Sequence, residues 1–439
     1  MNFDRFFALA KEKGISEAQI QLTRSSATSV RLFKREIDSY SVNDSQSIIA
    51  CGIYNGRFGS ATTQKFGKDA FAFLIDQIIM TASYSEKDDG VGLFQGSEKY
   101  HRRNVYSRAL EAKPMKEKLA LLRAVEEGIY AYDPRISEAE VSYAERASYD
   151  EFHNSFGLKL KQKSNYFYLY AGAVARQEEE TKTFADVFLD NDFAKFDKDA
   201  FVKSICARTL SKFGGQPCKS GKYPTVLSRD IVSDLLSYFL TSAIADEVQR
   251  HSSFLEGKLG SKIASRKLTI EEKPLTKNVF FSYFDDEGVA TQNKVIVKNG
   301  VLKQLFYNRE TAQKDGVRSS GNAAWEGSKI GTGFLNVFVK AGKHSFAEMI
   351  STIKEGVYIT EIAGLGTGMN SNSGDFSCQA EGYKIVDGKI AEPLNLITLS
   401  GNLLKMLGDL KEFDNNVMMT SGAISCADAF IKKMSIGGI

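Results

Sequence analysis

The chain has 439 residues, a formal net charge of +3 at pH 7, 43% hydrophobic residues and 25% charged residues. This composition is typical of a soluble globular protein, so it excludes a disordered chain, and the length predicts two or three domains. The balance of 57 Lys and Arg against 54 Asp and Glu argues against direct nucleic-acid binding, because such proteins usually carry a concentrated basic face.

The chain carries no signal for a membrane and favours a reducing compartment. Its longest charge-free apolar stretches, Leu235–Ala245 and Leu394–Leu404, are 11 residues long, whereas a membrane-spanning helix needs about 20. The first 14 residues alternate charged and apolar side chains and predict no signal peptide. An odd number of cysteines without a CxxC pair predicts free thiols and therefore a cytoplasmic protein. The five are Cys51, Cys206, Cys218, Cys378 and Cys426.

The N-terminal part is predicted to be rich in strands. Ala18, Ile20 and Leu22 alternate with polar residues, which is the period of a half-buried strand. Asn55-Gly56 lies between two strand-like runs and is a strong signal for a tight β-hairpin. Strands are expected over residues 16–24, 29–33, 37–42 and 48–54, and later over 136–148, 156–164 and 166–174.

Helical periodicity alternates with these strands in the first half. Apolar residues recur at helical spacing over residues 68–83, over the segment from Pro114 to Pro134, and over 198–213. The polar segment 85–103 contains Asp89-Gly90 and is predicted to be a loop. The first half therefore predicts a mixed α+β domain with grouped antiparallel strands.

Residues 214–223 hold three glycines and a proline and are the predicted linker. We therefore expect an N-terminal α+β domain over 1–213 and a C-terminal domain over 224–439. A helix with Ser228 as its N-cap follows the linker, and its apolar stripe is Ile231, Leu235, Leu236, Phe239 and Leu240. Beyond residue 260 strand patterns dominate, with hairpin signals at Asn299-Gly300 and Asp387-Gly388. The C-terminal domain is thus predicted to be mostly antiparallel β.

The histidines limit the chemistry that the chain can perform. There are four, His101, His153, His251 and His344, and no two lie within ten residues, so HExxH-type zinc sites are absent. Glu247 and His251 have helical i, i+4 spacing, but a solvated pair is the better interpretation. Cys378 and Cys426 have no neighbouring histidine in sequence, so buried, unreactive thiols are expected.

The segment GLGTGMNSNSGDF (364–376) is the most unusual in composition. It fails the GxGxxG spacing and has no GK[ST], so nucleotide binding is disfavoured. A loop that lines a cleft and holds an extended peptide through main-chain groups is one interpretation. The alternative is a system of tight turns that needs positive φ angles.

Two further segments stand out. Residues 315–333 carry the only tryptophan, Trp325, among small residues, which fits either a contact surface or core packing. Residues 284–288 (FDDEG) resemble a calcium loop only weakly, and we expect a solvated acidic turn instead.

Several long motifs in the second half resemble the TldD/PmbA family. Their order and spacing match the family across essentially the whole second half, and the first half has the size and grouping of elements that the family has. The motifs are FLEGKLGSKIASRKLTIEE (254–272), FDDEGVATQ (284–292), RSSGNAA (318–324), ITEIAGLGTGMNSNSGDFS (359–377) and ITLSGNLLKML (397–407), followed by Cys426.

The resemblance implies that the chain belongs to the TldE/PmbA branch, historically labelled a modulator of DNA gyrase. In the TldD branch an HExxxH helix and a C-terminal cysteine hold a catalytic zinc. The matching segment here, Ser237–Glu247, reads SYFLTSAIADE and has no histidine, which leaves Cys426 at a vestigial ligand position. The resemblance therefore implies no zinc and no catalytic residue in this chain, and zinc in a TldD-like partner.

Three hypotheses follow. The first is a non-catalytic subunit of a cytoplasmic heterodimeric metalloprotease that acts on unfolded or linear peptides, with a homodimer plausible when the partner is absent. The second is a regulatory protein that acts on a topoisomerase or its toxin system without proteolysis. The third, a self-sufficient hydrolase using Cys378 or Cys426, has the least support. Under the first, the residues expected to face the peptide channel or the partner are Gly321, Asn322, Trp325, Glu361, Asn370, Gly374, Asp375 and Phe376.

Overall fold

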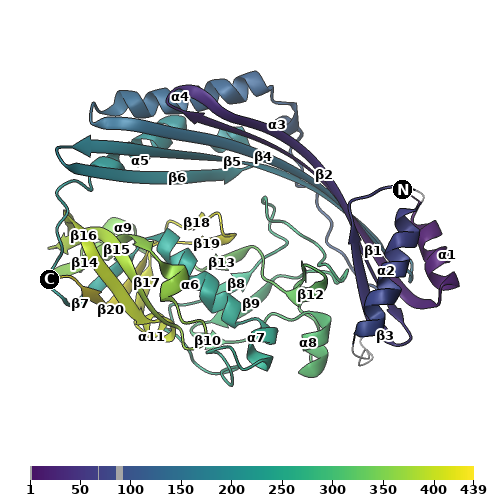
Figure 1. The fold of residues 1–439 in the computed structure, drawn as a ribbon. Coiled ribbons are helices and arrows are strands. Elements are labelled where there is room, and N and C mark those ends of the chain that lie inside the picture. The colour runs from purple at the N-terminus through teal and green to yellow at the C-terminus, as the bar shows by residue number, and fades with distance from the viewer. Residues whose placement is uncertain (1, 68, 86–91) are drawn as a thin grey trace.

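The computed structural model describes residues 2–67, 69–85 and 92–439. An arched sheet built from the first half of the chain stands over a second body built from the rest (Figure 1). The predicted loop over 85–103 falls partly outside the described residues, because Asp89-Gly90 lies within 86–91.

The arch is a six-stranded antiparallel sheet in the order β3-β2-β1-β4-β5-β6. Four of its strands are 19 residues long, which is several times the usual strand length of about five or six. The strands are β1 Ile15–Phe33, β2 Glu36–Tyr54, β3 Arg57–Thr63, β4 Ile136–Asn154, β5 Lys159–Gln177 and β6 Glu180–Asp190.

One face of the arch is apolar and covered by helices. Even-numbered residues of β1 supply both hydrophobic clusters on this face: Ala18, Ile20 and Leu22 under the first helices, and Val30 and Leu32 under the later ones. The helices lie on the convex side of the sheet (Figure 1). They are α1 Asp4–Glu12 and α2 Ala70–Tyr84 at one end, and α3 Arg108–Ala112, α4 Met115–Tyr132 and α5 Lys198–Leu210 at the other.

The opposite, concave face of the arch is polar. Thr23 donates a hydrogen bond to Asp150 at 2.8 Å, and the Ser25 hydroxyl lies 2.7 Å from that of Ser45. This face is turned toward the second body (Figure 1). The arch therefore presents hydroxyl and carboxylate groups to the space beneath it.

The second body contains a barrel-like sheet in the order β16-β15-β14-β7-β20-β17, which the additional β16–β20 pairing closes. Its strands are β7 Gly221–Leu227, β14 Glu355–Ala363, β15 Asp375–Val386, β16 Lys389–Asn402, β17 Leu410–Phe413 and β20 Ala429–Gly437. Most neighbours are antiparallel, and β7 and β14 are parallel.

A second six-stranded sheet, in the order β10-β9-β8-β13-β19-β18, completes this body together with a small hairpin. The strands are β8 Ile270–Glu272, β9 Lys294–Lys298, β10 Val301–Leu302, β13 Val337–Val339, β18 Met418–Met419 and β19 Ile424–Cys426, and the hairpin is β11 Ala323–Glu326 with β12 Lys329–Thr332. The helices are α6 Arg229–Ser242, α7 Ala245–Gln249, α8 Arg309–Lys314, α9 Phe346–Ile350, α10 Leu365–Gly368 and α11 Leu403–Gly408.

These observations confirm the predicted fold class, α+β with a mostly antiparallel C-terminal half. The three predicted hairpins at Asn55-Gly56, Asn299-Gly300 and Asp387-Gly388 are confirmed, and all six turn residues have positive φ. The division into domains at residues 214–223 stays a prediction.

The predicted strand boundaries in the first half are wrong. The four short strands expected before residue 55 are two continuous strands joined at Lys34-Arg35, where both residues have positive φ. The reason is that the middle of each strand, for example Arg24 to Ser26, lies between the two groups of helices and carries no apolar alternation. The short helix α1 was also not expected.

Helix α6 is the predicted helix after the linker. All five residues of its expected stripe are buried, and Ser228 is at the N-cap position. The Ser228 hydroxyl, however, donates to the Thr360 carbonyl at 3.3 Å rather than capping the helix. Within the described residues, none of the helices combines the length and apolar character that crossing a membrane would require.

Candidate functional site

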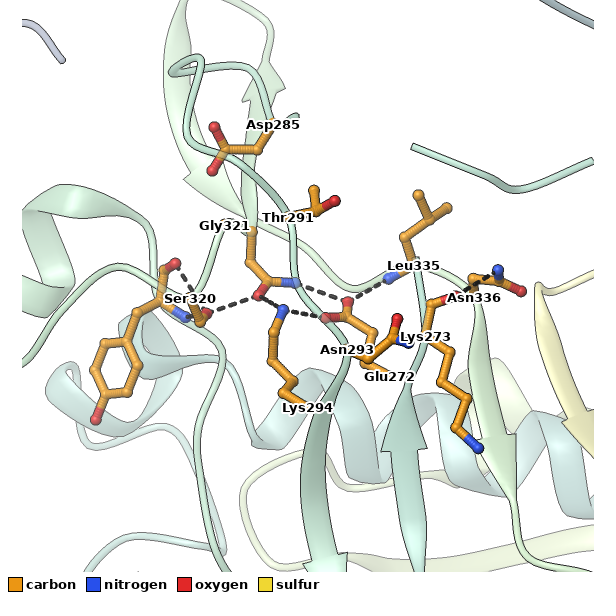
Figure 2. A network of polar contacts seen from close by, with 12 residues as sticks. Glu272, Lys273, Asp285, Thr291, Asn293, Lys294, Ser320, Gly321, Leu335 and Asn336 are labelled. Atoms are coloured by element: carbon orange, nitrogen blue, oxygen red, sulfur yellow. Dashed lines mark hydrogen bonds and ion pairs between the residues drawn. The ribbon is translucent and has the colours of Figure 1, made fainter. Parts of the chain in front are cut away.

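A buried polar network joins the end of β8 to the start of β9 (Figure 2). The side chains of Glu272 and Lys294 form an ion pair with exposed fractions of 1% and 4%. Asn322 joins them, because its Nδ2 donates to Glu272 Oε1 at 2.8 Å and its Oδ1 accepts from Lys294 Nζ at 2.7 Å. The Leu335 N–H also donates to Glu272, at 2.8 Å. Each buried charge is therefore compensated by an opposite charge and by hydrogen bonds.

The motif RSSGNAA contributes Ser320 and Asn322 to this network, and its Gly321 determines the local backbone conformation. Gly321 has a φ of 71°, and a Cβ there would lie 3.0 Å from the Ala290 carbonyl oxygen. Asn322 also accepts from the Ser320 hydroxyl at 2.6 Å and donates to the Gly333 carbonyl at 2.9 Å. Both Gly321 and Asn322 are buried, so the structure places these two predicted channel residues inside the network.

The segment FDDEG is buried except for Asp286, which is half-buried, so the expectation of a solvated turn is wrong. Asp285 accepts from the N–H groups of Glu287, Val289 and Ala323 at 2.9–3.0 Å. Asp286 accepts from the Trp325 N–H at 2.9 Å, and Glu287 accepts from the Arg309 N–H at 2.9 Å. Main-chain donors compensate these carboxyl groups, and this compensation could not be read from residue types alone.

These acidic residues and Trp325 join the second body to the arch. Gln21 Nε2 donates to Asp286 Oδ1 at 3.1 Å, and the Trp325 indole N–H donates to Gln21 Oε1 at 3.3 Å. The Trp325 ring packs against the buried cluster of Cys51, Ile53 and Leu93. The contact that Trp325 makes in this structure is therefore within the chain.

Further contacts hold the arch along its length. The Tyr283 hydroxyl donates to the Lys161 carbonyl at 2.7 Å, and Gln162 Nε2 donates to the Phe281 carbonyl at 3.0 Å. At the other side, Lys212 Nζ pairs with Glu361 at 2.6 Å. The arch and the second body thus meet at separate places, and a cleft remains between two of them.

The cleft has a volume of about 450 Å³ and lies between strand β6 and the second body. One wall is formed by consecutive residues of β6, Phe184 to Leu189. The other wall is formed by the start of α6, by Thr360, Glu361 and Ile362 of β14, and by residues 418–421. Its volume falls in the range of small-molecule sites, about 300–1,000 Å³.

The glycine-rich loop lies beyond the end of β14 and is largely bonded to itself. Asn370 Oδ1 accepts from the N–H groups of Asn372 and Ser373 at 3.0 and 3.1 Å, and Asp375 accepts from Ser373 and Asn402. Asn370 and Asp375 are exposed, whereas Gly374 and Phe376 are buried. Of the predicted residues, only Glu361 lines the cleft described above.

The region of the expected vestigial metal site does not fit zinc. Phe239 and Leu240, which lie in the matching segment on α6, are buried and apolar, and the Cys426 thiol is fully buried and donates to the Arg229 carbonyl at 3.2 Å. Burial raises the pKa of Cys426 far above its usual value, so the thiol stays protonated at neutral pH. Among the residues that the structure describes, no cluster of three or more His, Cys, Asp or Glu could hold a metal ion.

Two family models match this chain. The PmbA/TldA metallopeptidase central domain matches residues 108–213, and the PmbA/TldA metallopeptidase C-terminal domain matches residues 220–438. Metalloprotease PmbA of Escherichia coli O157:H7 is 25% identical over 98% of this chain and 94% of its own length. A metalloprotease of Methanothermobacter thermautotrophicus is 34% identical over 61% of this chain and 60% of its own length.

Solved structures show the same fold. A protein of Thermotoga maritima named as a modulator of DNA gyrase has a TM-score of 0.91 at 28% identity and covers 99% of both chains. TldE of Thermococcus kodakarensis has a TM-score of 0.90 at 22% identity, over 99% of this chain and 100% of its own. The fold and the matched domains thus define a protein of the metallopeptidase class. The chain belongs to the PmbA/TldD family.

The buried Glu272–Lys294 ion pair is expected to affect the free energy of unfolding. Lys294→Met leaves the Glu272 carboxylate buried without its countercharge, which costs about 3–5 kcal/mol. Lys298→Met, on the same strand but exposed, is the matched control and should change the free energy of unfolding by less than about 0.5 kcal/mol. Urea unfolding measures both, and equal losses in the two variants would show that the pair is not a stabilising contact.

Glu287 is expected to make the stability of the protein depend on pH. Burial raises its pKa to about 7, against the opposing effect of the Arg309 N–H, whereas an unfolded glutamate has a pKa near 4.3. The folded state therefore binds the extra proton, and the wild type loses stability as the pH rises from about 4.3 to about 7.

The neutral variant Glu287→Gln escapes this loss. It should match the wild type near pH 4.5 and be more stable at pH 8, by at most about 3 kcal/mol. The exposed Glu326→Gln is the control and should show no such pH-dependent gain. Thermal unfolding across this pH range measures the difference, and parallel curves for wild type and Glu287→Gln would contradict it.

Proposed function

We propose that this chain is a zinc-lacking, TldE-like subunit of a cytoplasmic heterodimeric metalloprotease that acts on unfolded or linear peptides. The observation that carries the proposal is the chemistry of α6 and Cys426. In the segment where the resemblance places a zinc-binding helix, Ser237–Glu247, this chain has the buried apolar residues Phe239 and Leu240, and the remaining cysteine is a protonated, hydrogen-bonded thiol. One neutral thiol cannot supply the three protein ligands of a catalytic zinc site.

The division of labour follows from this chemistry. A TldD-like partner supplies the zinc, which lowers the pKa of a bound water, and a glutamate that acts as the general base. This chain supplies shape: its arch and second body complete the channel through which a peptide reaches the partner's metal. No step of the hydrolysis is assigned to side chains of this chain.

The polar concave face of the arch supports a role in handling unfolded peptides. Its central residues are Thr23, Ser25, Ser29 and their bonded partners, whose hydroxyl and carboxylate groups hydrate well. A hydrated wall does not trap apolar side chains by burial, because the hydrophobic effect needs apolar surface on both sides. An unfolded segment can therefore move along this face without binding to it through its apolar side chains.

The alternative is a regulatory protein that acts on DNA gyrase. The observation that favours it is the name of the Thermotoga maritima relative. The net charge of +3 gives no support for direct DNA contact, so such an effect would be indirect. The gyrase alternative predicts altered supercoiling by purified gyrase on addition of this chain alone.

Co-expression tests the proposed function. This chain and a TldD-like chain from the same genome should form a stable complex that cleaves an unfolded peptide, whereas neither chain alone does so. The control is the complex with the partner's metal-binding histidines replaced, which should assemble but not cleave. Peptide cleavage by this chain alone in the presence of a chelator would contradict the proposal and favour the hydrolase hypothesis.

Metal analysis separates the roles of the two chains. The purified chain should contain no stoichiometric zinc, and the complex should contain about one zinc per heterodimer. Cys426→Ala should leave the zinc content and cleavage rate of the complex unchanged, because its thiol is bonded to the Arg229 carbonyl. One tightly bound zinc per isolated chain, lost in Cys426→Ala, would overturn the assignment.

A further inference from the structure

Strand β6 is an open edge of the arch where it borders the cleft. It ends the sheet, and within the described residues it pairs with β5 only. Six consecutive residues, Phe184 to Leu189, line the cleft. Side chains of a strand alternate between its two faces, so one face alone would contribute every second residue to a cleft. Because residues 184–189 all line the cleft, the edge of β6, with its main-chain groups, borders it.

The register of the hairpin shows which main-chain groups point outward. Gln177 and Glu180 flank a two-residue turn and form the hydrogen-bonded pair that closes it. The main-chain N–H and C=O groups of even-numbered residues of β6 therefore bond to β5, and those of odd-numbered residues point away from the sheet. Two contacts agree with this parity. The Thr183 carbonyl accepts from Lys212 Nζ at 2.8 Å, and the Val187 N–H donates to the Asp186 carboxylate at 2.8 Å.

The outward groups that border the cleft belong to Ala185, Val187 and Leu189. The Val187 N–H is already bonded to Asp186, which leaves its carbonyl and both main-chain groups of Ala185 and Leu189 pointing into the space. Lys212 closes one end, because it bonds Thr183 on one wall and Glu361 on the other. The open stretch of edge is thus five residues long, 185–189.

Side chains beside this edge provide apolar contact. Val187 and Tyr168, which pairs with Leu189, have exposed fractions of 41% and 40%. Met418 and Met419 line the opposite wall. Main-chain pairing with alternating apolar contacts is the way in which an extended peptide adds a strand to a sheet.

The charge of the cleft specifies the occupant further. Asp186, Asp230 and Asp234 line it, and Arg229 is the cationic residue of the lining. Glu361 is paired with Lys212, whose ammonium group also contacts Glu381. The carboxylates outnumber the guanidinium by three to one. A cationic side chain is therefore favoured over an anionic one.

We infer that the edge of β6 over residues 185–189 binds an extended, lysine- or arginine-bearing peptide segment as an added strand, in this chain and without the partner's metal. The inference deepens the proposed function, because it gives the zinc-lacking subunit a peptide site of its own. It also gives that site a preference for cationic segments.

The probe is a fluorescein-labelled, acetylated and amidated ten-residue peptide with two lysines, and the readout is fluorescence anisotropy with the full-length chain alone. The unmodified peptide should bind saturably. The same sequence N-methylated at alternate residues should bind at least about tenfold more weakly, because it loses main-chain donors. Replacing both lysines of the peptide by glutamates should weaken binding at least about fivefold. In the double variant Asp230→Asn/Asp234→Asn, this difference in affinity between the lysine and glutamate peptides should largely disappear.

Matched proline variants test the edge itself. Ala185→Pro removes an outward N–H inside the cleft while leaving the ladder to β5 intact, since proline is tolerated on an edge strand when its nitrogen faces away. It should weaken binding at least about tenfold. Thr181→Pro has the same parity on the same strand but lies outside the cleft, and should bind like the wild type. Thermal unfolding of both variants checks that the fold is intact.

Several results would overturn the inference: no saturable binding by the wild type, equal binding of the N-methylated peptide, or wild-type affinity in Ala185→Pro. These results are distinct from failure of the proposed function, because peptide binding uses the isolated chain and proteolysis uses the complex. A complex that cleaves peptides while the isolated chain binds none would remove this inference and leave the proposed function standing.

Discussion

The central contact between the two halves of the chain is a junction at which carboxyl groups of the second body are held by main-chain N–H groups and by the arch. Asp285 ties together the turn that follows it and strand β11, while Asp286 reaches both Trp325 and Gln21 of β1. Buried carboxyl groups are costly unless each oxygen is bonded, so this arrangement tolerates little movement. The two halves of the chain are thereby held at a defined spacing, and the cleft beside β6 depends on that spacing.

The long sheet carries two environments on its two faces. Its convex face is apolar under the two groups of helices, and its concave face is lined with hydroxyl, amide and carboxylate groups. The two environments are separate because successive side chains of a strand point to opposite faces of the sheet. The same feature explains why a large sheet can stand over the second body with an open space beneath it: a hydrated face gains nothing by collapse.

The segment in which the resemblance expects metal ligands is packed with apolar side chains. Phe239 and Leu240 of α6 belong to the main hydrophobic core of the second body, and Cys426 belongs to the same cluster. An apolar helix stabilises the fold through burial, whereas a set of unoccupied ligands would leave polar groups without partners. The packing of this segment therefore contributes to the stability of the family fold.

The sequence by itself determined the fold class, the three Asn-Gly and Asp-Gly hairpins, the helix with its five-residue stripe, and the absence of paired histidines, because each of these follows from local residue types and spacing. Tertiary structure alone decided the continuity of the 19-residue strands, since their polar middles lie where helices do not cover the sheet. It also decided the burial of Asp285 and Glu287, because their bonds to the N–H groups of Ala323 and Arg309 join segments 22 or more residues apart. The role of Asn322 between Glu272 and Lys294 was decided in the same way. The cleft beside β6 belongs to the same group, because its walls are 40 to more than 200 residues apart along the chain and meet only when the arch is fixed over the second body.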